Sequence, residues 1–423
     1  MEINNMPAKN DIDALVRQAV FGTDPQQKTE LYRTVRRAAL DSGIYPASIQ
    51  GLYKAAGKGL YHGITVPAIN IRGVTYPIAC AVFRAAMKDK VGALIFEIAR
   101  SEIGYTAQRP GEYATCVLAA AVKEGYKGPV FIMGDHFQVN RAKYQENPEA
   151  ELKTIKELVK DSIEAGFFNI DIDASTLVDI SKTSLEEQQE HNSAVTAEMT
   201  RFIRGIEPKG VTVSIGGEIG EIGKGNSTVA DLRAFIDSYR RRLDKNMEGI
   251  SKISVQTGTT HGGVVLPDGS IAQVKIDFNT LKELSKVARE DYGLSGAVQH
   301  GASTLPDEAF DMFPRVNTVE VHLATGFQNI LFDSPRFPSN LLESINRHLD
   351  TRYPNERKTG ETEEQFLYKT RKRAFGDFKK ELWGIPEADL QAIMTELENR
   401  FSLIFHKLNA TDTVKLVKKY AAK

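Results

Sequence analysis

The chain has 423 residues, 41% of them hydrophobic, which is enough for one large domain with an appendage or for two domains. Its formal net charge of −1 argues against a general nucleic-acid-binding or anionic-membrane-binding protein. Cys80 and Cys116 are the only cysteines, and their apolar surroundings predict buried free thiols. The N-terminus has no apolar signal core, and no apolar run approaches the roughly 20 residues that span a bilayer. We therefore expect a cytoplasmic protein without nucleic-acid or membrane partners.

Residues 1–60 are predicted to form an N-terminal helical extension. Leu15, Val16 and Ala19 are spaced for one face of a helix. Ser42-Gly43 is expected to end a second helix, and Pro46 to open a third. This extension would cap the domain that follows.

From residue 63 a pattern repeats, in which an apolar strand is followed by a polar or glycine-containing end and then by an amphipathic helix. Most of the strands are continuous apolar runs, as expected for parallel strands that are covered on both faces. The predicted strands are Ile64–Ile69, Ala93–Ile98, Val130–Met133, Phe168–Ile172, Val211–Ile215, Ile253–Gln256, Gly296–Gln299 and Thr318–Leu323. This repeat predicts an α/β fold, a (β/α)8 TIM barrel, over residues 61–335. The alternative, a doubly wound open sheet, is disfavoured because no Gly-x-Gly-x-x-Gly follows the first strand.

Residues 336–423 are predicted to form a C-terminal helical arm, with helices over 337–349 and 362–423. The arm contains a basic run of Lys369, Arg371, Lys372 and Arg373. Such a run is usually a solvated helix face. Alternatively, it extends over the mouth of a barrel, its own or a neighbour's, and meets an anion.

Polar side chains gather at the carboxyl ends of the predicted strands, where the active site of such a barrel lies. Four of the eight histidines fall at these ends. Three imidazoles with a carboxylate match a Zn²⁺ site that leaves one position open for water or substrate. The strand-end residues are Asn70, Glu97 to Ser101, Asp135, His136, Asp171, Asp173, Glu218, Glu221, His261, His300 and His322.

A phosphate cradle is also expected at this rim. Glycines follow His261 and His300, and their backbone N–H groups, with the hydroxyl of Ser303, could hold an anion. A helix starting at Thr304 or Leu305 would point its N-terminal dipole at the same anion. Each feature also has a simpler interpretation: Asp171 and Asp173 could cap turns, and Ser303 could be a helix N-cap.

The order and context of these motifs resemble class II, metal-dependent fructose-bisphosphate or tagatose-bisphosphate aldolases over about residues 50–410. The motifs are Val66-Pro-Ala-Ile-Asn70, Gly134-Asp-His136, Asn169-Ile-Asp-Ile-Asp-Ala-Ser175, Gly217-Glu-Ile-Gly220, Gly258-Thr-Thr-His-Gly262, Gln299-His-Gly-Ala-Ser303, Thr325-Gly-Phe-Gln328 and Phe405-His-Lys-Leu-Asn-Ala410.

The resemblance implies a role for each motif residue. It makes His136, His261 and His300 the zinc ligands, Glu218 an additional or alternate ligand and Asp135 the acid/base. It also implies that the phosphate of dihydroxyacetone phosphate is held by Gly262, Gly301, Ser303 and Thr325, with a monovalent cation such as Na⁺ or K⁺ nearby. We expect further substrate contacts from Asn70, Ser101 and His322, and from Arg371 or Arg373 toward a second anion. We expect a homodimer or homotetramer.

Two departures from the family pattern concern ketose recognition. The family's Asn-Ile-Asp-Thr at the eighth strand is replaced by His322-Leu-Ala-Thr325, and its long acidic loop after the fifth strand is missing. Either Glu221 or His322 substitutes for the loop acid, or the reaction differs. A geometric condition applies as well: Asp135 and His136 can both face the site only if the chain leaves regular strand geometry near Gly134.

The leading hypothesis is a zinc-dependent aldolase of carbohydrate metabolism, such as glycolysis, that cleaves a phosphorylated ketose to dihydroxyacetone phosphate and an aldehyde. A second keeps the metal and the barrel but takes a sugar with one phosphate. A third is a non-catalytic, sugar-phosphate-binding, aldolase-like subunit. A metal-dependent hydrolase is weaker, because no His-x-His stands at a strand end.

Overall fold

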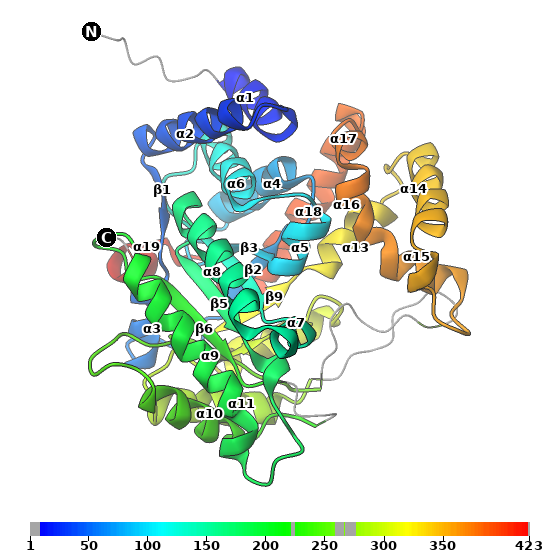
Figure 1. The fold of residues 1–423 in the computed structure, drawn as a ribbon. Coiled ribbons are helices and arrows are strands. Elements are labelled where there is room, and N and C mark those ends of the chain that lie inside the picture. The colour runs from blue at the N-terminus through cyan, green and yellow to red at the C-terminus, as the bar shows by residue number, and fades with distance from the viewer. Residues whose placement is uncertain (1–8, 221–224, 259–265, 267–275, 422–423) are drawn as a thin grey trace.

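The computed structural model describes residues 9–220, 225–258, 266 and 276–421 (Figure 1). Within these residues, nine parallel strands form one sheet, surrounded by helices. The strands are β1 Ile44–Ala47, β2 Val66–Asn70, β3 Ile95–Ala99, β4 Gly128–Gln138, β5 Asn169–Asp173, β6 Ser214–Glu218, β7 Lys252–Ser254, β8 Ala297–Gln299 and β9 Glu320–Leu323. The helices that follow the barrel strands include α4 Thr75–Lys88, α5 Arg100–Tyr105, α6 Pro110–Glu124, α8 Pro148–Ala165, α9 Leu185–Ile206, α10 Val229–Arg241, α11 Phe278–Glu290, α12 Met312–Arg315 and α13 Thr325–Asp333.

Strands β2 to β9 form a closed barrel, so the predicted (β/α)8 fold is confirmed. Their order along the sheet is β4-β3-β2-β9-β8-β7-β6-β5, and a direct pairing of β4 with β5 closes the ring. Each of the eight predicted strands overlaps one of these. The apolar runs are buried on both faces, as in β2 and β3, where every residue is buried. All strands run the same way, so their polar carboxyl ends lie at one rim.

The N-terminal extension contains a strand that was not predicted from the sequence. Residues 11–58 were expected to be helical. Three helices are present there: α1 Lys9–Phe21, α2 Pro25–Asp41 and α3 Gln50–Gly57. The expectation that Pro46 opens a helix was wrong, because Pro46 lies inside β1 and pairs with Val130 of β4. Proline has no backbone N–H and is tolerated in β1 because this edge strand pairs on one side only.

The C-terminal residues are helical and pack on the barrel. They form α14 Ser339–Arg352, α15 Glu363–Thr370, α16 Ala374–Asp377, α17 Lys379–Leu382, α18 Glu387–Lys407 and α19 Val414–Tyr420. α18 lies against α4, where Arg84 forms ion pairs with both Glu398 and Glu124. Beyond α18, the hydroxyl of Thr413 accepts hydrogen bonds from the backbone N–H groups of Gly92 and Ala93, just before β3. Among the described residues, no helix is long and apolar enough to cross a membrane.

Candidate active site

Strand β4 carries a bulge that brings two neighbouring side chains into the barrel. Its register against β5 shifts between Gly134 and Phe137, and His136 has a φ of +40°. Asp135 and His136 therefore both line the same cavity, which meets the geometric condition stated above. At Gly134, a Cβ atom would lie 2.3 Å from the ring of Phe137, so only glycine fits beneath this ring.

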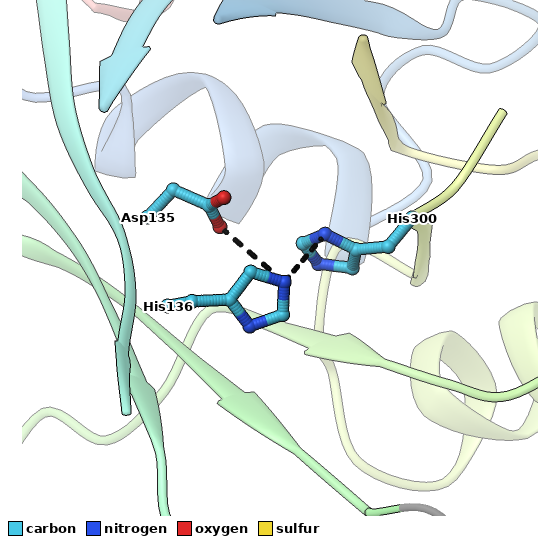
Figure 2. Close-up of side chains that lie close together, drawn as sticks. All are labelled: Asp135, His136 and His300. Atoms are coloured by element: carbon cyan, nitrogen blue, oxygen red, sulfur yellow. Dashed lines mark hydrogen bonds and ion pairs between the residues drawn. The ribbon is translucent and has the colours of Figure 1, made fainter. Parts of the chain in front are cut away.

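His136 and His300 face each other across this cavity (Figure 2). Nε2 of His136 lies 3.0 Å from Nδ1 of His300 and 4.0 Å from a carboxylate oxygen of Asp135. His300 comes from the end of β8, and its Nε2 lies 3.1 Å from the hydroxyl of Ser254. Thus two imidazole nitrogens and one carboxylate converge from β4 and the end of β8.

The other ring nitrogen of His136 is held by two carboxylates. Nδ1 lies 3.0 Å from Asp173 of β5 and 3.2 Å from Glu218 of β6. Burial alone would lower the pKa of His136, but Asp135, Glu218 and Asp173 hold it well above its ordinary value. Burial and the nearby Asp173 raise the pKa of Glu218 to about 7. Asp173 also accepts hydrogen bonds from the N–H and hydroxyl of Ser175, so the turn-capping interpretation of Asp173 is correct as well.

His322 of β9 lies beside His300, with ring centroids 4.0 Å apart, and contacts three carboxylates. Its Nδ1 is 2.6 Å from Glu97 and 3.4 Å from Asp135, and its Nε2 is 2.6 Å from Glu320. Burial would lower the pKa of His322, but Glu97 and Asp135 raise it well above its ordinary value. Burial raises the pKa of Glu97 to about 8, although His322 opposes this shift. Burial would likewise raise the pKa of Asp135, but His136 and His322 hold it well below its usual range.

A buried lysine continues this network into the barrel interior, and sequence reasoning missed it. Nζ of Lys252 lies 2.8 Å from Asp171 and also pairs with Glu320. The hydroxyl of Tyr53, from α3, donates to the other oxygen of Glu320. The sequence did contain a signal, since Lys252 directly precedes the predicted strand Ile253–Gln256 and Glu320 lies within the predicted strand Thr318–Leu323. A buried charge of this kind requires an opposite charge nearby.

The residues that converge at His136 fit a divalent metal ion. Ligand atoms of Asp135, His136 and His300 all lie within 4.8 Å of one another, and so do those of His136, Asp173 and Glu218. Imidazole nitrogens with carboxylate oxygens are the donors that Zn²⁺ takes at catalytic sites. The carboxylates at Nδ1 would orient the His136 ring so that Nε2 is presented to the ion.

The cavity around these residues measures about 510 Å³, which suits a small polar substrate. Besides Asp135 and His136, eight of the predicted substrate and metal residues line it: Asn70, Ser101, Glu218, His300, Gly301, Ser303, His322 and Thr325. Glu221, His261 and Gly262 lie outside the described residues.

The basic run of the C-terminal arm reaches this cavity through a residue other than the two expected. Arg371 pairs with Asp333, Arg373 pairs with Glu356, and neither lines the cavity. Lys372, between them, does line it. The run thus contacts the site through its central residue.

The predicted phosphate cradle is described in part. Gly301 has a φ of +69°, and the hydroxyl of Ser303 accepts a hydrogen bond of 2.7 Å from the N–H of Ala324. The expected helix at Thr304 or Leu305 was wrong. The first helical turn runs from Asp307 to Asp311 and follows Pro306, so Ser303 is not its N-cap. The residue before a proline is disfavoured from helical backbone, which opposes a helix that begins at Thr304 or Leu305, ahead of Pro306.

Known proteins resemble the chain in sequence pattern and in fold. The family model of class-II fructose-bisphosphate aldolase matches residues 48–381. No curated protein sequence matches the chain. Among solved structures, the chain is similar to a fructuronate-tagaturonate epimerase from Cohnella laeviribosi, with a TM-score of 0.60, 11% identity and coverage of 90% of this chain and 86% of that chain.

Two other structures share the fold at similarly low identity. A probable tagatose 6-phosphate kinase from Sinorhizobium meliloti 1021 gives a TM-score of 0.55 at 15% identity, covering 84% of this chain and 93% of that chain. Fructose-bisphosphate aldolase from Campylobacter jejuni gives a TM-score of 0.51 at 18% identity, covering 87% of this chain and 96% of that chain. At these identities the structural likeness shows the fold alone. The family model, which spans most of the barrel and part of the arm, shows that the chain belongs to the class II fructose-bisphosphate aldolase family.

Proposed function

We propose that this protein is a zinc-dependent aldolase that reversibly cleaves a phosphorylated ketose to dihydroxyacetone phosphate and an aldehyde. The observation that carries the proposal is the pair of facing imidazole nitrogens of His136 and His300 beside the carboxylate of Asp135. This group lies in a cavity large enough for a sugar phosphate. The family resemblance adds His261 as a third ligand.

The bound ion would supply Lewis-acid polarisation of the ketose carbonyl, so no Schiff-base lysine is needed. His136 and His300 would hold it, with Glu218 as an additional or alternative ligand. Asp135 would take the proton from the hydroxyl on the carbon beyond the bond that breaks. This role suits Asp135, because its carboxylate lines the cavity beside the imidazole of His136, within reach of a bound substrate.

The phosphate of the dihydroxyacetone phosphate half would be bound by Gly301, Ser303 and Thr325, which line one side of the cavity. A Na⁺ or K⁺ ion near this phosphate is part of the same proposal. We further propose a cytoplasmic homodimer or homotetramer, which light scattering of the purified protein would test.

The test combines metal analysis with an assay of carbon–carbon cleavage. Purified protein is expected to hold zinc through His136 and His300, and chelation should abolish activity. Asp135→Asn should lower cleavage roughly 10²–10⁴-fold, the usual contribution of a general acid/base, while zinc content stays near normal. Asp161→Asn, in the surface pair with Arg109, is the matched control and should be fully active.

Three results would each assign another function. Full activity after complete metal removal would exclude the metal mechanism. Sugar-phosphate binding without turnover, in protein with full zinc content, would favour the non-catalytic aldolase-like subunit. Conversion of a ketose to its epimer without release of an aldehyde would assign an epimerase.

A further inference from the structure

The charges around the cavity are separated into two regions. One region contains Glu97, Asp135 and Glu218 together with three histidines, and the fourth lining carboxylate, Glu102, pairs with Arg72. Among the cavity-lining residues that the structure describes, the lysines and arginines are Arg72 and Lys372, which lie on one side of it, near enough for Arg72 to lower the pKa of Lys372. A ligand that spans the cavity would therefore place an anionic group at this side.

Lys372 has no carboxylate partner within the part of the chain that the structure describes, whereas its neighbours in the basic run all have one. Lys369 pairs with Glu361, and Arg373 pairs with Glu356. Nζ of Lys372 lies 5.8 Å from the ring centroid of Tyr105, another cavity residue. Burial lowers the pKa of Lys372, and the nearby Arg72 and Arg373 lower it further. Glu102 and Glu356 oppose this shift without forming an ion pair with Lys372, so its amine remains available at the cavity.

Arg72 is fixed in position with one terminal nitrogen available. Its Nε donates to Glu102 at 2.7 Å, and its Nη1 donates to Gln328 at 3.0 Å and lies 3.5 Å from the hydroxyl of Thr325. Its Nη2 makes no hydrogen bond to any described residue. Arg72 therefore presents a donor beside the hydroxyl of Thr325 within the cavity.

Lys372 forms no ion pair with a described residue. Close packing of the neighbouring backbone fixes its position at the cavity. A Cβ atom at Gly73 would lie 2.2 Å from the ring of Phe375, and one at Gly376 would lie 2.1 Å from the carbonyl oxygen of Tyr105. The segment after Lys372 is therefore seated against the residue that follows Arg72 and against the end of α5. This arrangement leaves the ammonium group ready to bind a ligand.

We propose that Lys372 and Arg72, with Thr325, form one anion clamp that binds a phosphomonoester, and that the substrate is a sugar carrying a single phosphate. The described cavity has one cationic side, so a second phosphate would lie among the carboxylates. Arginine and lysine donors with a hydroxyl match the oxygens of a phosphate dianion. The inference rests on the proposed function for the nature of the sugar, but the clamp itself can be tested without catalysis.

The first experiment is calorimetric titration of inorganic phosphate into full-length, chelator-treated protein. One phosphate per chain is expected, and Lys372→Met should weaken its binding roughly 10- to 100-fold, the value of a charge-assisted hydrogen bond. Lys372→Arg should retain most of the affinity. Lys369→Met, which removes a paired lysine three residues away, should leave phosphate binding unchanged. Acetate, titrated in parallel, should bind more weakly than phosphate.

Unchanged phosphate affinity in Lys372→Met, with a folded protein by circular dichroism, would overturn the clamp, and two phosphates per chain would overturn the single-phosphate substrate.

The second experiment compares ketose monophosphates with bisphosphates by KM in zinc-loaded enzyme. A higher kcat/KM for the bisphosphate would contradict the inference. Phosphate binding that depends on Lys372 in a protein without aldolase activity would retain the clamp and reject the proposed function, so the two failures are distinguishable.

Discussion

At the scale of single residues, the barrel interior holds a buried charged network in which Lys252 pairs with Asp171 and Glu320, and Tyr53 donates to Glu320. His136, His300 and His322 were identified as strand-end residues, because the carboxyl ends of parallel strands carry the polar groups of such a fold. Lys252, Glu320 and Tyr53 were missed, because nothing in a single strand shows which opposite charge another strand will bring to it. Lys252 and Glu320 stand on β7 and β9, separated by β8. Only the barrel pairing places them together.

This interior network predicts how stability depends on pH. Burial would raise the pKa of Glu320, but Lys252 and His322 lower it to about 2. A carboxyl whose pKa is lower in the folded state stabilises the protein above its unfolded pKa of about 4.3, and this contribution is lost as pH falls toward 2. Glu320→Gln should therefore destabilise the protein at pH 7, by roughly 3–5 kcal/mol. The deficit relative to wild type should shrink between pH 4.5 and 2.

Urea unfolding of chelator-treated protein across this pH range measures the effect without a contribution from metal loss. Glu198→Gln, which breaks the partly exposed pair with Lys156, is the control and should cost at most about 1 kcal/mol at any pH. A Glu320→Gln deficit that is the same at pH 7 and pH 2.5 would show that the charge of Glu320 does not stabilise the fold.

At the scale of elements, strand β4 shows where a local pattern stops being informative. The apolar run Val130–Met133 and the glycine after it predicted a strand that breaks at Gly134. In the structure the strand continues to Gln138, and the residue with positive φ is His136. The ring of Phe137 packs over Gly134, and the register shift against β5 spans Gly134 to Phe137. A contact of this kind depends on side-chain packing and is invisible to strand propensity.

The space around two glycines, Gly134 in the bulge and Gly205 on α9, predicts opposite effects of Gly→Ala changes on stability. Gly134→Ala should displace the Phe137 ring, lower stability by about 1–3 kcal/mol and weaken zinc binding at least about tenfold, since Asp135 and His136 would move. Gly205→Ala, on the exposed side of α9 with open space around it, should stabilise the protein by about 0.5–1 kcal/mol. Urea unfolding measures the change in stability, and a competitive zinc titration measures the change in zinc affinity. Normal zinc affinity in Gly134→Ala would show that the bulge does not depend on this contact.

At the scale of the whole molecule, the sequence predicted helices at both ends of the chain but not their contacts. Amphipathic spacing shows that a helix buries one face, and not which surface covers it. In the structure the two ends meet. Trp383, the only tryptophan of the chain, packs edge-to-face on Phe21 at the end of α1, with ring centroids 5.5 Å apart. Arg17 of α1 also donates a hydrogen bond to the backbone carbonyl of Trp383.

This contact makes Trp383 a reporter of whether the terminal helices unfold with the barrel. Trp383 is 5% exposed, so we expect blue-shifted emission in the native state and one urea transition that coincides with the loss of far-UV circular dichroism. Phe21→Ala should shift the emission to the red and lower stability by about 1–3 kcal/mol, because it removes an aromatic contact from a partly buried site. Leu40→Ala, at a side chain 51% exposed on α2, should change neither quantity. Loss of the Trp383 signal at lower urea than the circular dichroism signal would instead mean that the terminal helices undock while the barrel stays folded. In that case the 336–423 arm and the 1–60 extension would behave as units separate from the barrel, and Lys372 would leave the cavity before the barrel unfolds.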